Sequence, residues 1–190
     1  MINSDSDIIM EVISEGVDSD DAEIQLEENI RMDAGGKIDL YAKSSGEDAD
    51  DAQIQIKKVS DELLLDGNKE FALAPNITAV NDILIKAEST DEAEIQIEES
   101  NFLQSGNAIK LSGLGASGEG EVETKKFVQL VAGSDITLEV TGSEAELTID
   151  ENNVFDANSG AGTITLNAGG GELEIKSGTT FNPTPPTIIP

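Results

Sequence analysis

One short pattern recurs along the chain and limits the fold more than any other feature of the sequence. In residues 22–26 (AEIQL), small or aliphatic residues alternate strictly with polar ones. Such alternation places one set on one face of a strand and the other set on the opposite face. The pattern occupies residues 20–26, 50–56, 91–97 and 143–149, and residues 170–175 keep its apolar pair. It predicts half-buried β-strands.

Weaker apolar pairs fall between these copies and are separated by turn-forming residues such as Asp66-Gly67-Asn68 and Asn158-Ser159-Gly160. Glycine and asparagine readily adopt the positive φ angles that tight turns need. The pairs lie roughly 8 to 19 residues apart, which is typical of many short strands joined by turns. The pairs are Ile38/Leu40, Leu63/Leu65, Phe71/Leu73, Ile83/Ile85, Ile109/Leu111, Val128/Leu130, Ile136/Leu138 and Ile164/Leu166.

The predicted strands are too thin to be stable alone. Each offers two or three inward residues of modest size, and aromatic residues make up only 3% of the chain, so burial must come from stacking many units. We therefore expect an all-β, elongated, repetitive β-helix. The irregular spacing favours an intertwined homotrimer in which three chains each supply one wall. The alternatives are a single-chain β-solenoid and a β-sandwich.

Two segments interrupt the strand pattern. Residues 113–121 are rich in glycine, and we expect a hinge there between an N-terminal β segment, 1–112, and a C-terminal one, 122–181. Residues 182–190 contain four of the five prolines. Because proline lacks a backbone N–H, this tail is expected to be extended and to strap onto a neighbouring subunit.

Composition excludes several classes of function. The formal net charge is -28, which disfavours binding to nucleic acid or to anionic membranes. Cysteine and histidine are absent, which removes the usual thiolate nucleophile, the usual neutral-pH base and the commonest metal ligands. We expect a non-enzymatic protein without a resident cofactor. The N-terminus does not read as a secretory signal, and no apolar run is long enough to span a membrane.

Clusters of acidic residues precede several copies of the repeated pattern. Oxygen-rich turns can hold Ca²⁺, which takes six to eight oxygen ligands. We treat these clusters as candidate calcium ligands, with solvated turns as the default interpretation. The strongest local candidate is the turn that contains Asp156 and Asn158, and the others are Asp20, Asp21, Asp50, Asp51, Asp91 and Glu92. On the polar face of the strands, Gln25, Gln55 and Gln96 recur at equivalent places, which predicts a ladder of side chains across neighbouring strands.

Three stretches resemble the x-D-I-x-L strands of phage tail-fibre, spike and baseplate β-helices: residues 1–10 (MINSDSDIIM), 36–40 (GKIDL) and 133–138 (GSDITL). The resemblance implies a homotrimeric structural component of a phage-like virion, synthesised in the host cytoplasm and acting in assembly, host attachment or capsid decoration. Its expected partners are copies of itself, other virion proteins and a host-surface glycan or receptor.

Two other functions stay open from the sequence. A Ca²⁺-dependent adhesin or carbohydrate-binding β-solenoid would be a monomer whose folding depends on the ion. A polysaccharide-cleaving spike would need a pair of carboxylates across a sugar bond. With 39 acidic residues in the chain, no particular pair stands out, so the enzyme is a distant third.

Overall fold

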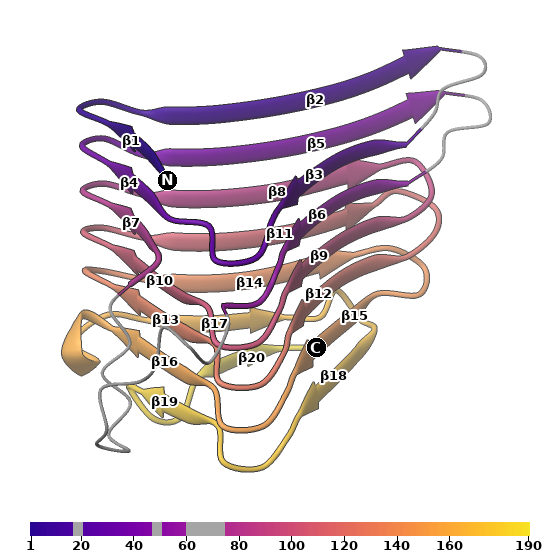
Figure 1. The fold of residues 1–190 in the computed structure, drawn as a ribbon. Coiled ribbons are helices and arrows are strands. Elements are labelled where there is room, and N and C mark those ends of the chain that lie inside the picture. Colours follow the sequence, from indigo (N-terminus) through magenta and orange to yellow (C-terminus); the bar gives the residue numbers. More distant parts are fainter. Residues whose placement is uncertain (17–20, 47–50, 60–74) are drawn as a thin grey trace.

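The chain winds into a three-sided parallel β-solenoid (Figure 1). This computed structural model describes residues 1–16, 21–46, 51–59 and 75–190. One coil passes through one strand of each of three sheets, here named A, B and C. All strand pairs join one coil to the next in parallel. Within the described residues, no helix is long and apolar enough to cross a membrane.

The three sheets run side by side along the solenoid axis. Sheet A consists of β1 (Ile2–Ser4), β4 (Met32–Ala34), β7 (Ile77–Ala79), β10 (Phe102–Ser105), β13 (Gln129–Ala132), β16 (Val154–Ala157) and β19 (Thr180–Asn182). Sheet B consists of β2 (Ile8–Gly16), β5 (Ile38–Gly46), β8 (Ile83–Ser89), β11 (Ile109–Gly115), β14 (Ile136–Thr141), β17 (Ile164–Asn167) and β20 (Thr187–Ile189). Sheet C consists of β3 (Ala22–Leu26), β6 (Ala52–Ile56), β9 (Ala93–Ile97), β12 (Gly120–Thr124), β15 (Glu146–Ile149) and β18 (Glu172–Ile175). A 3₁₀ turn, η2 (Asn158–Gly160), follows β16.

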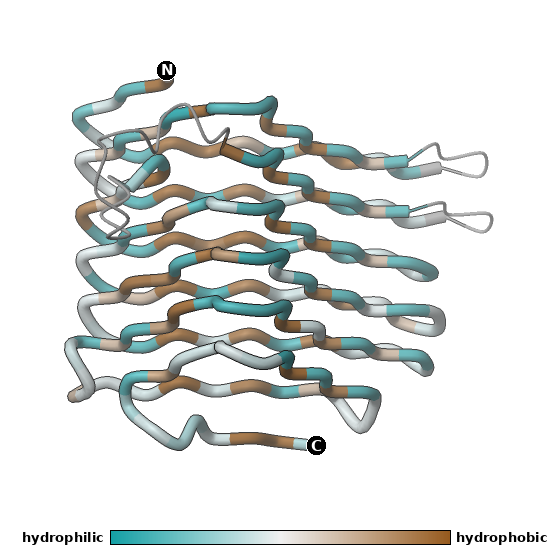
Figure 2. Tube along the Cα trace, turned by 60° about the horizontal axis from the view of Figure 1, so that its bottom comes forward, coloured by the Kyte–Doolittle hydropathy of each residue, from teal (hydrophilic) through white to brown (hydrophobic). Residues whose placement is uncertain are grey.

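Stacked aliphatic side chains form the core. Residues at the same place in successive coils, here called a column, lie directly above one another across each sheet. Alternation along each strand points one column inward and the next outward, which Figure 2 shows as alternating hydrophobic and hydrophilic segments. One inward column of sheet B is isoleucine in six successive coils. It begins with Ile8 in the first coil, and the five that follow are almost fully buried: Ile38, Ile83, Ile109, Ile136 and Ile164. The predicted all-β repeat fold is thus confirmed.

One chain supplies all three walls of the prism. Ile24, Ile54, Ile95, Val122 and Leu147 form one column of sheet C. The first two are 30 residues apart in the sequence and the last two are 25 residues apart. The corners of the coils absorb these differences, so the irregular spacing does not require three chains. The wall arrangement is that of the single-chain β-solenoid, and the intertwining that we expected first is not what closes the prism.

The glycine-rich segment 113–121 lies inside the fourth coil. Gly113 and Gly115 belong to β11, which pairs with β8 on one side and β14 on the other. A β-carbon on Gly113 would lie 2.4 Å from the carbonyl oxygen of Glu121, and one on Gly115 would lie 2.3 Å from that of Glu119. The glycines therefore allow a close approach of backbone at the corner between sheets B and C. The sheets are continuous across the segment where a hinge was expected.

The proline-containing tail returns to the same solenoid. Asn182 ends β19, and residues 187–189 form β20, which pairs in parallel with β17. The peptide bonds preceding Pro183 and Pro185 are cis. The prolines occupy the turn, and the strand forms after them, so they do not prevent the tail from joining a ladder. The expected extended strap is corrected to a seventh strand of sheet B.

Candidate functional site

The outer face of sheet C carries a row of stacked carboxylates. Its first outward column contains Glu94, Glu121, Glu146 and Glu172 in four successive strands. Neighbouring strands lie about 4.8 Å apart, so each of these carboxylates has another above or below it. Like charges placed directly opposite on a sheet destabilise it. This column, together with the outward column beside it, is named the sheet C face.

Glu121 sits in the middle of the sheet C face and has a strongly perturbed pKa. Partial burial, followed by the charges of Glu94, Glu123, Glu146 and Glu119, raises its pKa from 4.5 to about 7. Burial penalises the charged form, and neighbouring negative charges add to that penalty. The sheet C face therefore changes charge near neutral pH.

The second outward column of the sheet C face is a directional amide ladder. Gln25 donates from Nε2 to Oε1 of Gln55 over 3.1 Å, and Gln55 donates to Oε1 of Gln96 over 2.7 Å. Gln96 in turn donates to Oε2 of Glu123 over 2.9 Å. The ladder predicted from the recurring glutamines is confirmed. Its last acceptor is a carboxylate, and these hydrogen bonds link the four side chains from Gln25 to Glu123 from one coil to the next.

A column at the end of sheet C alternates in charge along the axis. It lies one residue beyond the strands and reads acid, base, acid, base, acid, base: Glu27, Lys57, Glu98, Lys125, Asp150 and Lys176. Lys57 Nζ lies 3.6 Å from Oε1 of Glu98, and Lys176 Nζ lies 2.6 Å from Oδ1 of Asp150. Five of the eleven basic residues of the chain thus lie within or beside this edge, because Lys58 and Lys126 directly follow Lys57 and Lys125. Lys126 Nζ lies 2.9 Å from Oε2 of Glu151. These ion pairs offset part of the repulsion along sheet C.

The structure brings some of the candidate calcium ligands together. Asp21, Asp51 and Glu92 lie in one column directly before sheet C, and the backbone N–H of Asp51 donates to Oδ1 of Asp21 over 3.2 Å. Burial and the charge of Asp51 raise the pKa of Glu92. Asp91 is exposed, and its backbone N–H donates to Oγ of Ser89. Asp20 and Asp50 lie outside the described residues.

The other candidate turn has a different arrangement. Asp156 belongs to β16, and its Oδ1 accepts a hydrogen bond from Nδ2 of Asn182 over 3.1 Å. Asn158 begins the 3₁₀ turn with a φ of 50° and is exposed. Among the described residues, no three acidic side chains are grouped so that they could hold a metal ion. The calcium sites stay a prediction from sequence.

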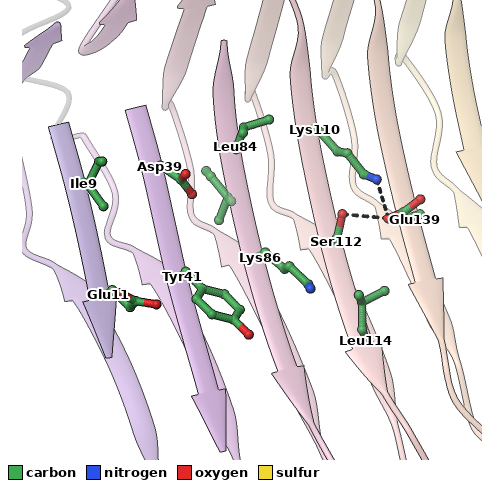
Figure 3. Close-up of a pocket in the computed structure, with 11 residues that line it drawn as sticks. Ile9, Glu11, Asp39, Tyr41, Leu84, Lys86, Lys110, Ser112, Leu114 and Glu139 are labelled. Carbon is green, nitrogen blue, oxygen red and sulfur yellow. Dashed lines mark hydrogen bonds and ion pairs between the residues drawn. The ribbon is translucent and has the colours of Figure 1, made fainter. Parts of the chain in front are cut away.

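The outer face of sheet B has a different character from sheet C. Three outward columns cross it and together are named the sheet B face. They begin at Ile9, Glu11 and Ile13 of β2 and continue through the later strands. A shallow groove with a volume of about 640 Å³ runs across β2, β5, β8, β11 and β14 (Figure 3). Aliphatic, aromatic, basic and acidic side chains all line it: Ile9, Glu11, Asp39, Tyr41, Leu84, Ile85, Lys86, Lys110, Ser112, Leu114 and Glu139.

Tyr41 and Lys86 occupy the middle of the groove. The Lys86 Nζ lies 5.3 Å from the centre of the Tyr41 ring and 2.5 Å from Oε2 of Glu88. The Tyr41 hydroxyl donates to the same oxygen of Glu88 over 3.2 Å. Burial and the charge of Glu88 raise the pKa of Tyr41 to about 12. The hydrogen bond and charge of Lys86 lower the pKa of Glu88 despite its partial burial. Tyr41, Lys86 and Glu88 thus hold one another in place.

Glu139 anchors the other side of the groove. Its Oε1 accepts hydrogen bonds from Nζ of Lys110 at 2.7 Å and from Oγ of Ser112 at 2.9 Å. All three side chains point out of neighbouring strands β11 and β14 toward one another (Figure 3). Lys110 is 45% exposed and Lys86 is 40% exposed. Both lysine side chains are thus ion-paired and still partly exposed.

Sequence reasoning did not identify the groove. Its residues come from five strands that are far apart in the chain, and they meet because the register aligns Glu11, Tyr41, Lys86, Ser112 and Glu139 in one column. The sequence does show leucine, isoleucine and tyrosine at outward positions of the strands, where the alternation predicts polar residues. These residues indicate a groove only once the neighbouring strands are known.

Comparison with known proteins gave no relative: no family model, no curated protein and no solved structure matches the chain. The arrangement of its own side chains therefore carries the functional argument.

Proposed function

We propose that the chain is a non-enzymatic structural module of a phage-like virion, in which a stacked β-solenoid forms part of a fibre, spike or capsid decoration. The observation that carries the proposal is the continuous in-register stack from β1 to β20. Its core is a set of aliphatic columns that run the height of the prism. Such a stack is suited to bearing load and presenting surfaces at fixed spacing.

The x-D-I-x-L resemblance supports the placement in a virion, and the aspartate and isoleucine of the motif each have a structural reason in two of the three stretches. In Asp7-Ile8 and Asp135-Ile136, the isoleucine is the first inward residue of a sheet B strand. The aspartate lies at the corner between sheets A and B and accepts a hydrogen bond from the next coil's backbone. The motif is thus a unit of coil stacking, which suits a structural role.

Copies of this chain can contact one another only through the outer faces or the ends of their prisms, because each prism is closed by one chain. The irregular spacing of the strands favoured an intertwined homotrimer, but one chain supplies all the walls of this prism. A homotrimer would then consist of three closed prisms packed side by side. The seven levels of sheets A and B span about 29 Å at about 4.8 Å per level, which is the height that each copy of this prism contributes to an assembly.

The proposal is tested by locating the protein. Antibodies raised against the purified chain and coupled to gold particles should label an appendage or the surface of particles sedimented from lysates of the source culture. A chain that stays entirely in the supernatant, with unlabelled particles, would contradict a virion role. Folding that collapses when EDTA is added would instead support the Ca²⁺-dependent adhesin.

A further inference from the structure

The sheet B face differs from the rest of a very acidic molecule in carrying both signs of charge beside exposed apolar groups. Ile9 and Ile13 are 60% and 47% exposed at one end of it, and Ile189 is 45% exposed at the other. Between them lie three bases, Lys43, Lys86 and Lys110, among the acids Glu11, Asp39, Glu88 and Glu139. Exposed apolar groups gathered on one face indicate a protein contact, and charges of both signs allow such a face to be complementary to a partner.

We infer that the sheet B face is the contact between two copies of this chain, packed face to face with their solenoid axes antiparallel. This inference rests on the proposed structural function and names the partner of that structure. The twofold axis runs along the strand direction and passes over β11, the central strand of the seven in sheet B. A second copy is the favoured occupant because the face is complementary to itself under this one operation.

The middle outward column shows the complementarity. It reads Glu11, Tyr41, Lys86, Ser112, Glu139, Asn167 and Ile189 from the first coil to the last. Reversing the order of the strands about Ser112 places Lys86 opposite Glu139 of the partner subunit, and the reverse pair forms as well. These are two ion pairs between the subunits, one on each side of the axis. The same operation places Glu11 opposite the partner's Ile189.

The two flanking columns contain no opposed carboxylates under this operation. Leu114 meets its own copy at the axis, and Glu88 meets the partner's Thr141. In the other flanking column Asp39 meets the partner's Thr165. Lys110 meets its own copy, but each of these lysines is already held by the Glu139 of its own subunit at 2.7 Å.

A pair with parallel solenoid axes would bring like charges together. With the twofold axis along the solenoid axis, every residue of the middle column would face its own copy. Glu11 would oppose Glu11, Lys86 would oppose Lys86 and Glu139 would oppose Glu139, and like charges across an interface cost free energy. The sheet C face cannot pair with itself either, because its first column is glutamate in four successive strands.

The area of the face is sufficient for a stable pair. The six spacings between seven strands, at about 4.8 Å each, and about seven residues at about 3.3 Å give a surface of about 670 Å² per copy. The pair would therefore bury about 1,300 Å² in total, which falls in the range of specific interfaces. Two sheets packed in this way lie about 10 Å apart.

Charge reversal tests the pairing. By light scattering, the purified chain should have twice the mass of 20.0 kDa. Lys86→Glu and Glu139→Lys should each weaken the pair by at least about tenfold, because each places like charges opposite one another twice. The double variant Lys86→Glu/Glu139→Lys should regain part of the lost affinity and bind more tightly than either single variant. The intersubunit pair is restored with its signs exchanged, although Lys110 loses the Glu139 of its own subunit.

Two further variants separate the contact from folding. Glu146→Lys reverses a charge on sheet C and should leave the mass of two chains unchanged, while Leu114→Asp at the axis should give single chains with an unchanged circular dichroism spectrum. Single chains in the wild type, or a folded double variant that binds no more tightly than either single variant, would overturn the pairing. A mass of three chains would also overturn it, in favour of the homotrimer. Neither result depends on whether gold-labelled antibodies find the protein on particles.

Discussion

The Oδ1 of Asp135 accepts a hydrogen bond of 2.8 Å from the backbone N–H of Thr163, which lies 28 residues later in the chain and one coil further along the axis. Asp7 makes the same contact with the N–H of Lys37 at 2.9 Å, and Asp82 makes it with the N–H of Ala108 at 3.1 Å. An aspartate thus occupies this corner in the first, third and fifth coils. Each one ties its coil to the next.

Replacing Asp135 tests the value of this corner contact. Asp135→Ala leaves the Thr163 N–H without its partner and should lower the free energy of unfolding by about 1 kcal/mol. Asp135→Asn keeps an oxygen acceptor at the same place and should lose less. Urea unfolding followed by circular dichroism measures both values. Equal stability of the alanine variant and the wild type would contradict the role given to this corner.

The raised pKa of Glu121 makes stability depend on pH. The folded protein holds this proton more tightly than the unfolded chain, because the folded pKa of about 7 exceeds 4.5. Stabilisation is therefore fully present below about pH 4.5 and is lost as the pH rises through 7. Glu121→Gln removes that loss and should raise the free energy of unfolding at pH 8 by about 1 kcal/mol, allowing for solvent screening.

The control for Glu121 is a second glutamate of the same face. Glu174→Gln changes an exposed residue of the last sheet C strand and should give a smaller difference between pH 5 and pH 8. The comparison uses urea unfolding of both variants and the wild type at the two pH values. If Glu121→Gln changes stability equally at both, the pKa assigned to Glu121 is wrong.

Tyr41 offers a direct spectroscopic test because it is the only tyrosine and the chain has no tryptophan. Its pKa of about 12 means that absorbance at the tyrosinate band should rise well above pH 10 while the circular dichroism spectrum stays native. Glu88→Gln removes a negative charge and the charged acceptor of the Tyr41 hydroxyl, so the pKa should fall toward 10. A wild-type midpoint at pH 10 in the folded protein would contradict the contact with Glu88.

Gly113 tests whether the glycine-rich segment is a tight corner. An alanine β-carbon there would lie 2.4 Å from one carbonyl oxygen and 3.1 Å from another, so backbone must move. Gly113→Ala should lower the free energy of unfolding by about 2 kcal/mol, whereas Thr137→Ala, on the outer face of β14, should change it by well under that amount. Tolerance of alanine at position 113 in denaturant unfolding would instead favour the flexible hinge.

Some features of this fold could be predicted from local pattern alone. The alternation in residues 22–26 indicated both the strand β3 and its buried side, because a strand has a period of two whatever it packs against. The glutamine ladder followed from equivalent positions in repeated strands. The pairing of the tail was not predicted, because the prolines were assumed to keep the whole segment out of a ladder. Pro183, Pro185 and Pro186 occupy the turn, and residues 187–189 pair with β17.

The sequence by itself determined which side chains turn inward and that burial must come from stacking, since both follow from alternation and from side-chain size. Only the tertiary structure decided which residues become neighbours along the axis. Lys86 and Glu139 share a column, Lys57 meets Glu98, and four glutamates align on sheet C, because the lengths of the corners set the register between coils. Corner lengths vary without a pattern that local sequence reveals, so the charge arrangement of the outer faces appears only when the coil is closed.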